Sequence, residues 1–175
     1  MNDQPNTEAT NVTPELRSNV LTDETYSIVI CDHSPDYPIM GFLQLCADRR
    51  FHQCIQNNFR ADAGLDSSQK YWIHADAGGT PKMTHLPIAP NYCYHDKHVR
   101  LMGWSAHGNV CGGFPGTEDK VIEAALYETI PHKIEAYPEA THFVYFARSI
   151  GIAEDAKAVL YCLKYEKGKI TTRKS

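Results

Sequence analysis

The sequence predicts an α/β fold in which a mostly parallel central β-sheet is flanked by helices and ends in a C-terminal antiparallel edge hairpin. Two observations lead to this prediction. Short apolar runs, typical of strands buried on both faces, alternate with stretches of helical periodicity that would serve as crossovers between parallel strands. Near the C-terminus, two strand-like runs are joined by residues 166–169, whose Gly168 suits a hairpin turn.

The N-terminal half is expected to contain a tail, three strands and one helix. Residues 1–24 are polar and poor in apolar side chains. We therefore expect a tail, or an arm that docks on a partner subunit, ahead of a single domain over residues 25–175. Apolar runs predict strands over Tyr26–Ile30, Ile39–Leu45 and Lys70–His74, the second of them fully buried. Between the last two, a short helix is predicted over Phe51–Phe59.

The C-terminal half continues the same alternation. Proline and turn-forming residues over Thr80–Lys97 predict an irregular loop, and Val99–Trp104 then predicts a strand. Apolar residues at helical spacing predict a helix over Glu118–Ile130, with Thr117 as its N-cap. The remaining strands are predicted over His142–Ala147, Ala158–Tyr165 and Ile170–Thr172.

Composition and charge exclude several classes of function. The 175 residues carry a net charge of −4 with both signs interspersed, and without a basic stripe nucleic acid is not an expected partner. No apolar run approaches the ~20 residues of a membrane-spanning helix, so no membrane partner is expected. The N-terminus lacks a charged segment followed by an apolar one, which predicts a cytoplasmic protein. The six irregularly spaced cysteines are therefore interpreted as free thiols or metal ligands rather than disulfides.

The candidate functional residues follow two of the buried strands. Cys46, Asp48 and Arg50 come directly after one apolar run, and His107 and Cys111 follow another. Two thiolates and one imidazole at the ends of buried strands make a three-ligand zinc set with one coordination position left open. Because an open position distinguishes catalytic from structural zinc, the pattern predicts a reaction at the metal.

Asp48 has two conceivable roles beside such a metal. It can bind zinc and close the open position, or it can pair with Arg50 and accept a hydrogen bond from a zinc-bound hydroxide. The alternatives without a metal are that Cys46 and Cys111 are ordinary buried thiols, and that Asp48 and Arg50 form an ordinary surface ion pair. The ordered combination of motifs favours the metal site.

Other segments are weaker candidates. Residues 93–98, Cys-Tyr-His-Asp-Lys-His, have suitable side chains for a metal, but their close spacing in a predicted loop offers no fourth ligand. Gly112 and Gly113 would let the backbone approach the metal and start a helix, with a phosphate-binding loop as the weaker alternative. Core packing is expected for Cys31, Cys54 and Cys162. Surface or capping roles are expected for His33, His52, His74, His85, His132 and His142, of which His74 could also border the pocket.

Taken in order, four segments resemble the β-class carbonic anhydrases. That family has a Cys-x-Asp-x-Arg motif, an Ala-Gly turn, a Gly-His-x-x-Cys-Gly segment and a closing hairpin. The corresponding segments here are Cys46–Arg50, Ala77–Gly79, His107–Gly112 and Leu160–Ile170. The chain departs from the family by Ala75-Asp76 in place of Arg-Asn, and by one extra residue between His107 and Cys111. The extra residue requires the loop to bulge before the imidazole can reach a metal.

The resemblance implies a β-carbonic-anhydrase-like domain that reversibly hydrates carbon dioxide to bicarbonate by attack of zinc-bound hydroxide. Cys46, His107 and Cys111 would be the Zn²⁺ ligands, and Asp48 with Arg50 would form the catalytic dyad. The resemblance also implies a homodimer or larger homo-oligomer with the active site near a subunit boundary. Two alternatives stay open: hydrolysis of a related small electrophile, carbon disulfide or carbonyl sulfide, and a carbonic-anhydrase-like binding module that catalyses nothing.

Overall fold

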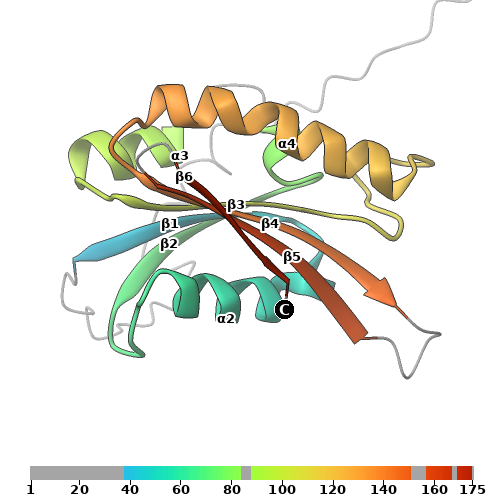
Figure 1. Ribbon diagram of the computed structural model, residues 1–175, viewed down its shortest axis with the longest axis horizontal. Coiled ribbons are helices and arrows are strands. Elements are labelled where there is room, and N and C mark those ends of the chain that lie inside the picture. Colours follow the sequence, from blue (N-terminus) through green and yellow to red (C-terminus); the bar gives the residue numbers. More distant parts are fainter. Residues whose placement is uncertain (1–37, 84–87, 151–156, 167–168, 175) are drawn as a thin grey trace, which may run out of the picture. The chain divides into compact units, whose positions relative to one another are not determined.

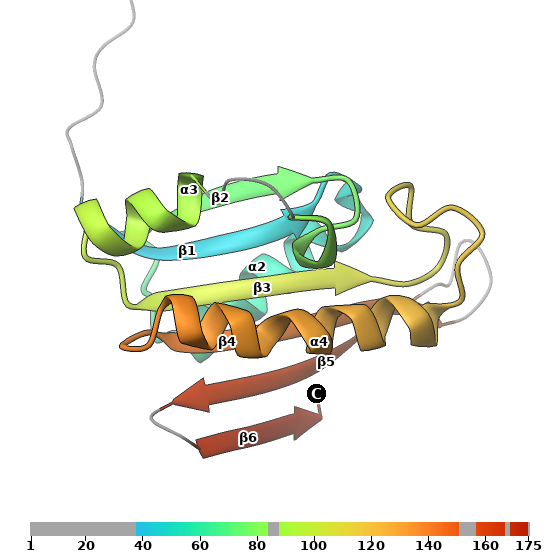
Figure 2. The same ribbon diagram turned by 90° about the horizontal axis from the view of Figure 1, so that it is seen from above.

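A computed structural model describes residues 38–83, 88–150, 157–166 and 169–174, which form a six-stranded sheet with helices on both faces (Figure 1). Across the sheet the strand order is β2-β1-β3-β4-β5-β6 (Figure 2). Four neighbouring strands are parallel: β1 (Ile39–Cys46), β2 (Lys70–Asp76), β3 (Leu101–His107) and β4 (Thr141–Ile150). The antiparallel strands β5 (Lys157–Glu166) and β6 (Lys169–Lys174) complete the sheet, so the predicted fold class is confirmed.

The sheet has an apolar layer on each face. Helix α2 (His52–Asp62) covers one face, while α3 (Ile88–Asn91) and the long α4 (Asp119–Ala136) lie on the other (Figure 1). Because strand side chains alternate between faces, Phe42 joins the core layer under α4 and its neighbour Leu43 joins the layer over α2. In the described part of the chain, no helix is both long and apolar enough to span a membrane.

Two of the element predictions are wrong. The segment predicted as an irregular loop contains a 3₁₀ turn (Thr80–Lys82), α3 and a π-helical turn (Tyr92–Asp96). Helices this short complete barely one turn, so they leave no periodic apolar pattern to find. Helix α4 begins at Asp119, with Glu118 rather than Thr117 at its N-cap and without a side-chain cap. The predicted strand Tyr26–Ile30, Cys31 and the boundary at residue 25 lie outside the described residues.

His142 also differs from its expected surface or capping role. It is fully buried on β4, where its Nδ1 accepts a hydrogen bond from Nε1 of Trp104 over 3.0 Å and its Nε2 donates to the Tyr137 carbonyl over 3.1 Å. Both ring nitrogens are therefore satisfied inside the protein, and burial lowers the pKa of this neutral imidazole. His142 is thus a core residue.

Candidate metal centre

The ends of two adjacent parallel strands bring the candidate ligands together. Cys46 is the last residue of β1, and His107 is the last residue of the neighbouring β3. The loop after β3 returns to place Cys111 beside them, and one ligand atom from each of the three side chains lies within 4.8 Å of the others. All three side chains are buried. This group could hold a metal ion.

The imidazole of His107 is oriented with one nitrogen toward the thiols. Its Nδ1 donates a hydrogen bond to the Gly108 carbonyl over 2.7 Å, and Phe51 packs against the ring with 5.0 Å between centroids. Since a carbonyl can only accept, the proton lies on Nδ1 and Nε2 carries a lone pair. This Nε2 is buried, and it has no hydrogen-bond partner in the described part of the chain. A metal ion would satisfy it.

The Sγ atoms of Cys46 and Cys111 lie 3.7 Å apart, and backbone N–H groups donate hydrogen bonds to them. The N–H of Gly78 donates to Sγ of Cys46 over 3.3 Å. Burial raises the pKa of Cys46, but the His107 side chain, which stabilises the thiolate when the imidazole is protonated, and backbone N–H groups outweigh it and lower the pKa from 9.0 to about 7. At Cys111 burial prevails, and the pKa is raised despite the N–H of Gly113. The Cys46 thiol therefore ionises near neutral pH, whereas the Cys111 thiol does not.

Asp48 is held against Arg50 at the rim of this centre. Nε of Arg50 donates to Oδ1 and Oδ2 of Asp48 over 3.1 and 3.0 Å, and Nη2 donates to Oδ2 over 2.6 Å. These hydrogen bonds lower the pKa of Asp48 from 3.8 to about 2. The same Oδ2 lies 3.8 Å from Nε2 of His107. Of the two roles open to Asp48, the structure therefore has the paired arrangement, with a carboxylate that is ionised at neutral pH and faces the ligand group.

The longer loop between His107 and Cys111 is accommodated by two left-handed residues. Asn109 and Val110 have φ values of 55° and 63°, a region that non-glycine residues seldom adopt. Nη2 of Arg50 donates to both of their carbonyls, over 2.9 and 3.0 Å. This is the bulge that the extra residue requires, and Arg50 therefore binds both Asp48 and the loop.

A second brace on this loop comes from α4. The Asn109 N–H donates to Oδ1 of Asp119 over 2.7 Å, at the first residue of the helix. A Cβ atom on Gly108 would lie 2.3 Å from the carboxyl carbon of Asp119, so this close contact needs glycine. Sequence reasoning missed Asn109 and Asp119. The tolerance of asparagine for the left-handed region was the available signal for Asn109.

In the glycine pair after Cys111, Gly113 allows close packing of two backbones, whereas Gly112 has open space around it. A Cβ atom on Gly113 would lie 2.3 Å from the backbone nitrogen of Gly78, the residue whose N–H reaches the Cys46 sulfur. The backbone at Gly78 can therefore approach only because residue 113 has no side chain. The predicted helix start at this pair is wrong, since α4 begins only at Asp119.

The rival segment of residues 93–98 does not assemble a ligand group in the structure. Cys93 is fully buried in the core, whereas His95, Asp96 and His98 are exposed. Elsewhere, Cys162 is buried and Cys54 on α2 is half-buried against the core, as expected. His74 lies on β2, where its Nδ1 is 2.8 Å from Oε1 of Gln44.

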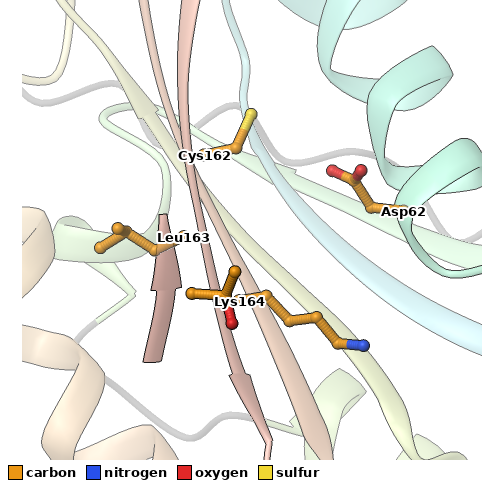
Figure 3. Close-up of a pocket in the computed structure, with 5 residues that line it drawn as sticks. Asp62, Cys162, Leu163 and Lys164 are labelled. Carbon is orange, nitrogen blue, oxygen red and sulfur yellow. The ribbon is translucent and has the colours of Figure 1, made fainter. Parts of the chain in front are cut away.

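A small cavity of about 120 Å³ lies away from this centre, between α2 and the β5–β6 hairpin (Figure 3). In the close-up, Asp62 projects from α2 while Cys162 and Lys164 project from β5. The lining residues are Asp62, Cys162, Leu163, Lys164 and Thr171. With one thiol and without an imidazole, this set does not reproduce the donors gathered around Cys46.

Comparisons with known proteins return little. No protein-family model matches the chain, and no curated protein matches it. Among solved structures, the chain is similar to the beta-carbonic anhydrase CcaA, with 12% sequence identity, 79% of each chain covered and a TM-score of 0.46.

Proposed function

We propose that this protein binds one zinc ion through Cys46, His107 and Cys111 and catalyses the reversible hydration of carbon dioxide to bicarbonate. The observation that carries the proposal is the buried Nε2 of His107, which has no hydrogen-bond partner among the described residues and lies 3.8 Å from a carboxylate held by Arg50, in a side chain grouped with two thiols. A core histidine with a purely structural role has both nitrogens satisfied, as His142 does.

The donor set and its spacing support zinc. Two sulfur atoms bound at about 2.3 Å to one tetrahedral zinc ion lie about 3.8 Å apart. The Sγ atoms of Cys46 and Cys111 are 3.7 Å apart, so they need almost no rearrangement to bind the same ion. Zinc at this position would act as a Lewis acid that lowers the pKa of water into the range of ~7 to 9.

The chain's own residues would orient the reacting water. Asp48 is an acceptor-only carboxylate at any pH well above about 2, because Arg50 holds its pKa there. It would accept a hydrogen bond from water beside the ligand group and so fix the direction of attack on carbon dioxide. Arg50 would keep Asp48 from becoming a metal ligand itself, since it donates hydrogen bonds to both carboxylate oxygens.

Stopped-flow measurement of carbon dioxide hydration by the zinc-loaded protein tests this proposal. We expect a rate that rises with pH from about 6 to about 9, as water ionises. Arg50→Ala should lower the rate at least ~10-fold, about 1.4 kcal/mol in the barrier, while metal content is retained. Asp48→Asn should lower it by a similar factor. The matched control is Arg49→Ala, which removes the neighbouring exposed arginine from the same turn and should leave the rate unchanged.

Several results would contradict the proposal. Full zinc content with no hydration over the same pH range would remove the carbonic anhydrase assignment and leave a metal-binding domain. Turnover of carbonyl sulfide or carbon disulfide by the same sample would then identify the alternative substrate. Equal losses in Arg49→Ala and Arg50→Ala would show that Arg50 has no specific role beyond surface charge.

A further inference from the structure

The turn at Asn109 and Val110 holds the guanidinium of Arg50 from outside its pair with Asp48. The Arg50 side chain is 50% exposed, and an exposed ion pair alone is held weakly because water and other rotamers compete with it. Nη2 of Arg50 also donates to the carbonyls of Asn109 and Val110. Both acceptors belong to the backbone, so the position of the guanidinium depends on the conformation of this turn.

The turn has a conformation that its own residues do not favour. Val110 has a φ of 63° although its side chain is β-branched, and the residue is 83% exposed, so core packing does not compensate for the strain. Such a conformation persists only where surrounding contacts impose it. The contacts that hold the turn therefore also decide where its two carbonyls point.

Two contacts to Asn109 impose the turn, one from each of two neighbouring elements. The Asn109 N–H donates to Oδ1 of Asp119 over 2.7 Å at the start of α4, and the Ser149 N–H donates to Oδ1 of Asn109 from β4. Neither Asn109 nor Asp119 belongs to the candidate ligand group. Their influence on that group therefore passes through the turn and through Arg50.

We propose that Asn109 and Asp119 are positioning residues that keep Arg50 on Asp48, and so keep Asp48 from becoming a metal ligand itself. The inference rests on the metal site of the proposed function, but not on carbon dioxide as its substrate. It also gives a role to the extra loop residue, because the turn which that residue allows supplies two carbonyls to Arg50.

Exchange of the Arg50 Nε–H with water, followed by nuclear magnetic resonance in metal-free protein, measures how firmly Arg50 is held. This Nε–H donates to both carboxylate oxygens of Asp48. We expect Asp119→Ala to speed the exchange at least ~10-fold, because the turn is released. Asp119→Asn keeps the acceptor oxygen and should stay within about twofold of wild type. The matched control is Glu118→Ala, at the same helix start, whose carboxylate pairs with Lys120 and whose loss should change nothing.

The substitution Val110→Gly separates the turn from the stability of α4. Glycine adopts the left-handed region without a steric penalty, so adding Val110→Gly to Asp119→Ala should recover at least about half of the lost protection. If Asp119 acted only as a favourable charge at the N-terminus of α4, a change at Val110 could not compensate for its loss. Absence of recovery overturns the proposal, and so does an equal loss in Glu118→Ala.

Azide binding to cobalt-loaded protein tests the consequence for the metal, since an added anion binds only while a coordination position is open. The visible absorbance of cobalt follows the binding. Asp119→Ala should retain about one cobalt per chain and raise the Kd for azide at least ~10-fold, because the released Asp48 competes for that position. In Asp48→Asn protein, the same substitution at Asp119 should change the Kd by less than about twofold.

The outcomes distinguish this inference from the proposed function. Full cobalt content with unchanged azide affinity in Asp119→Ala overturns the inference and leaves the proposed function standing. A weakening of azide binding that persists in Asp48→Asn protein overturns it too, because the turn would then act by placing Cys111. A wild-type chain that binds no cobalt removes the proposed function, and with it the role of Asp119 at a metal.

Discussion

Cys46 and Cys93 are both buried thiols, yet their environments give them opposite properties. Cys46 is 4% exposed and has a pKa lowered to about 7, whereas Cys93 is completely buried and has a pKa raised to about 11. Burial raises the pKa at both positions, so the difference comes from the neighbours. Cys46 has an imidazole and backbone N–H groups around its sulfur. At Cys93 desolvation by burial is the cause of the shift.

The difference shows that closeness in space, rather than closeness in sequence, brings the candidate metal ligands together. Residues 93–98 place a cysteine and two histidines within six positions, but the turn points them in different directions. Cys93 enters the core while His95 and His98 are exposed. Cys46 and His107 are far apart in sequence and meet because β1 and β3 are parallel neighbours whose carboxyl ends reach the same edge.

Measuring zinc content tests whether Cys46, rather than Cys93, belongs to the metal-binding group. The largest of the expected effects is on this quantity. Wild type should hold about one zinc per chain, and Cys46→Ala or His107→Ala should reduce this below about a tenth, because two remaining donors do not make a stable site. Cys93→Ala should retain full zinc. Elemental analysis after gel filtration gives the numbers. Normal zinc in both ligand variants with loss in Cys93→Ala would relocate the site to residues 93–98.

The pH dependence of thiol ionisation sharpens the comparison. A pKa lowered to about 7 means that the Cys46 thiolate is present above that pH and disappears below it. In metal-free protein, ultraviolet thiolate absorbance should lose a step near pH 7 in Cys46→Ala, while Cys93→Ala should leave that step unchanged. Because protons compete with the metal for thiolate, zinc affinity should fall as pH drops through 7. An unaltered step in Cys46→Ala would contradict the assigned environment.

The sequence was sufficient for the fold class, because the central strands β1, β3 and β4 are largely apolar runs and the hairpin has a recognisable turn residue in Gly168. It also pointed to the side chains that the structure brings together, since Cys46 and His107 are the residues at which two strands end. It could not supply the bracing of the His107–Cys111 loop, which depends on Arg50 and Asp119 reaching left-handed backbone from other elements. Nor could it place His142, because a histidine satisfied by Trp104 has no distinguishing spacing.

For stability we expect the opposite result: substitution of Cys93 should matter more than substitution of Cys46. This is the smallest of the expected effects. In metal-free protein, Cys93→Ser should lower the free energy of unfolding by about 1–3 kcal/mol, because a hydroxyl replaces sulfur in an apolar core. Cys46→Ser should cost less than about 1 kcal/mol, since the Gly78 N–H that donates to the sulfur can donate to a hydroxyl instead. Urea denaturation with zinc chelated measures both, and Cys54→Ser on the half-buried face of α2 is the control, expected within about 0.5 kcal/mol of wild type. A larger loss at Cys46 than at Cys93 would mean that the metal-free thiol at the strand end is itself a packing residue. Cys46 would then stabilise the fold in the absence of a metal, which would contradict a role limited to metal binding.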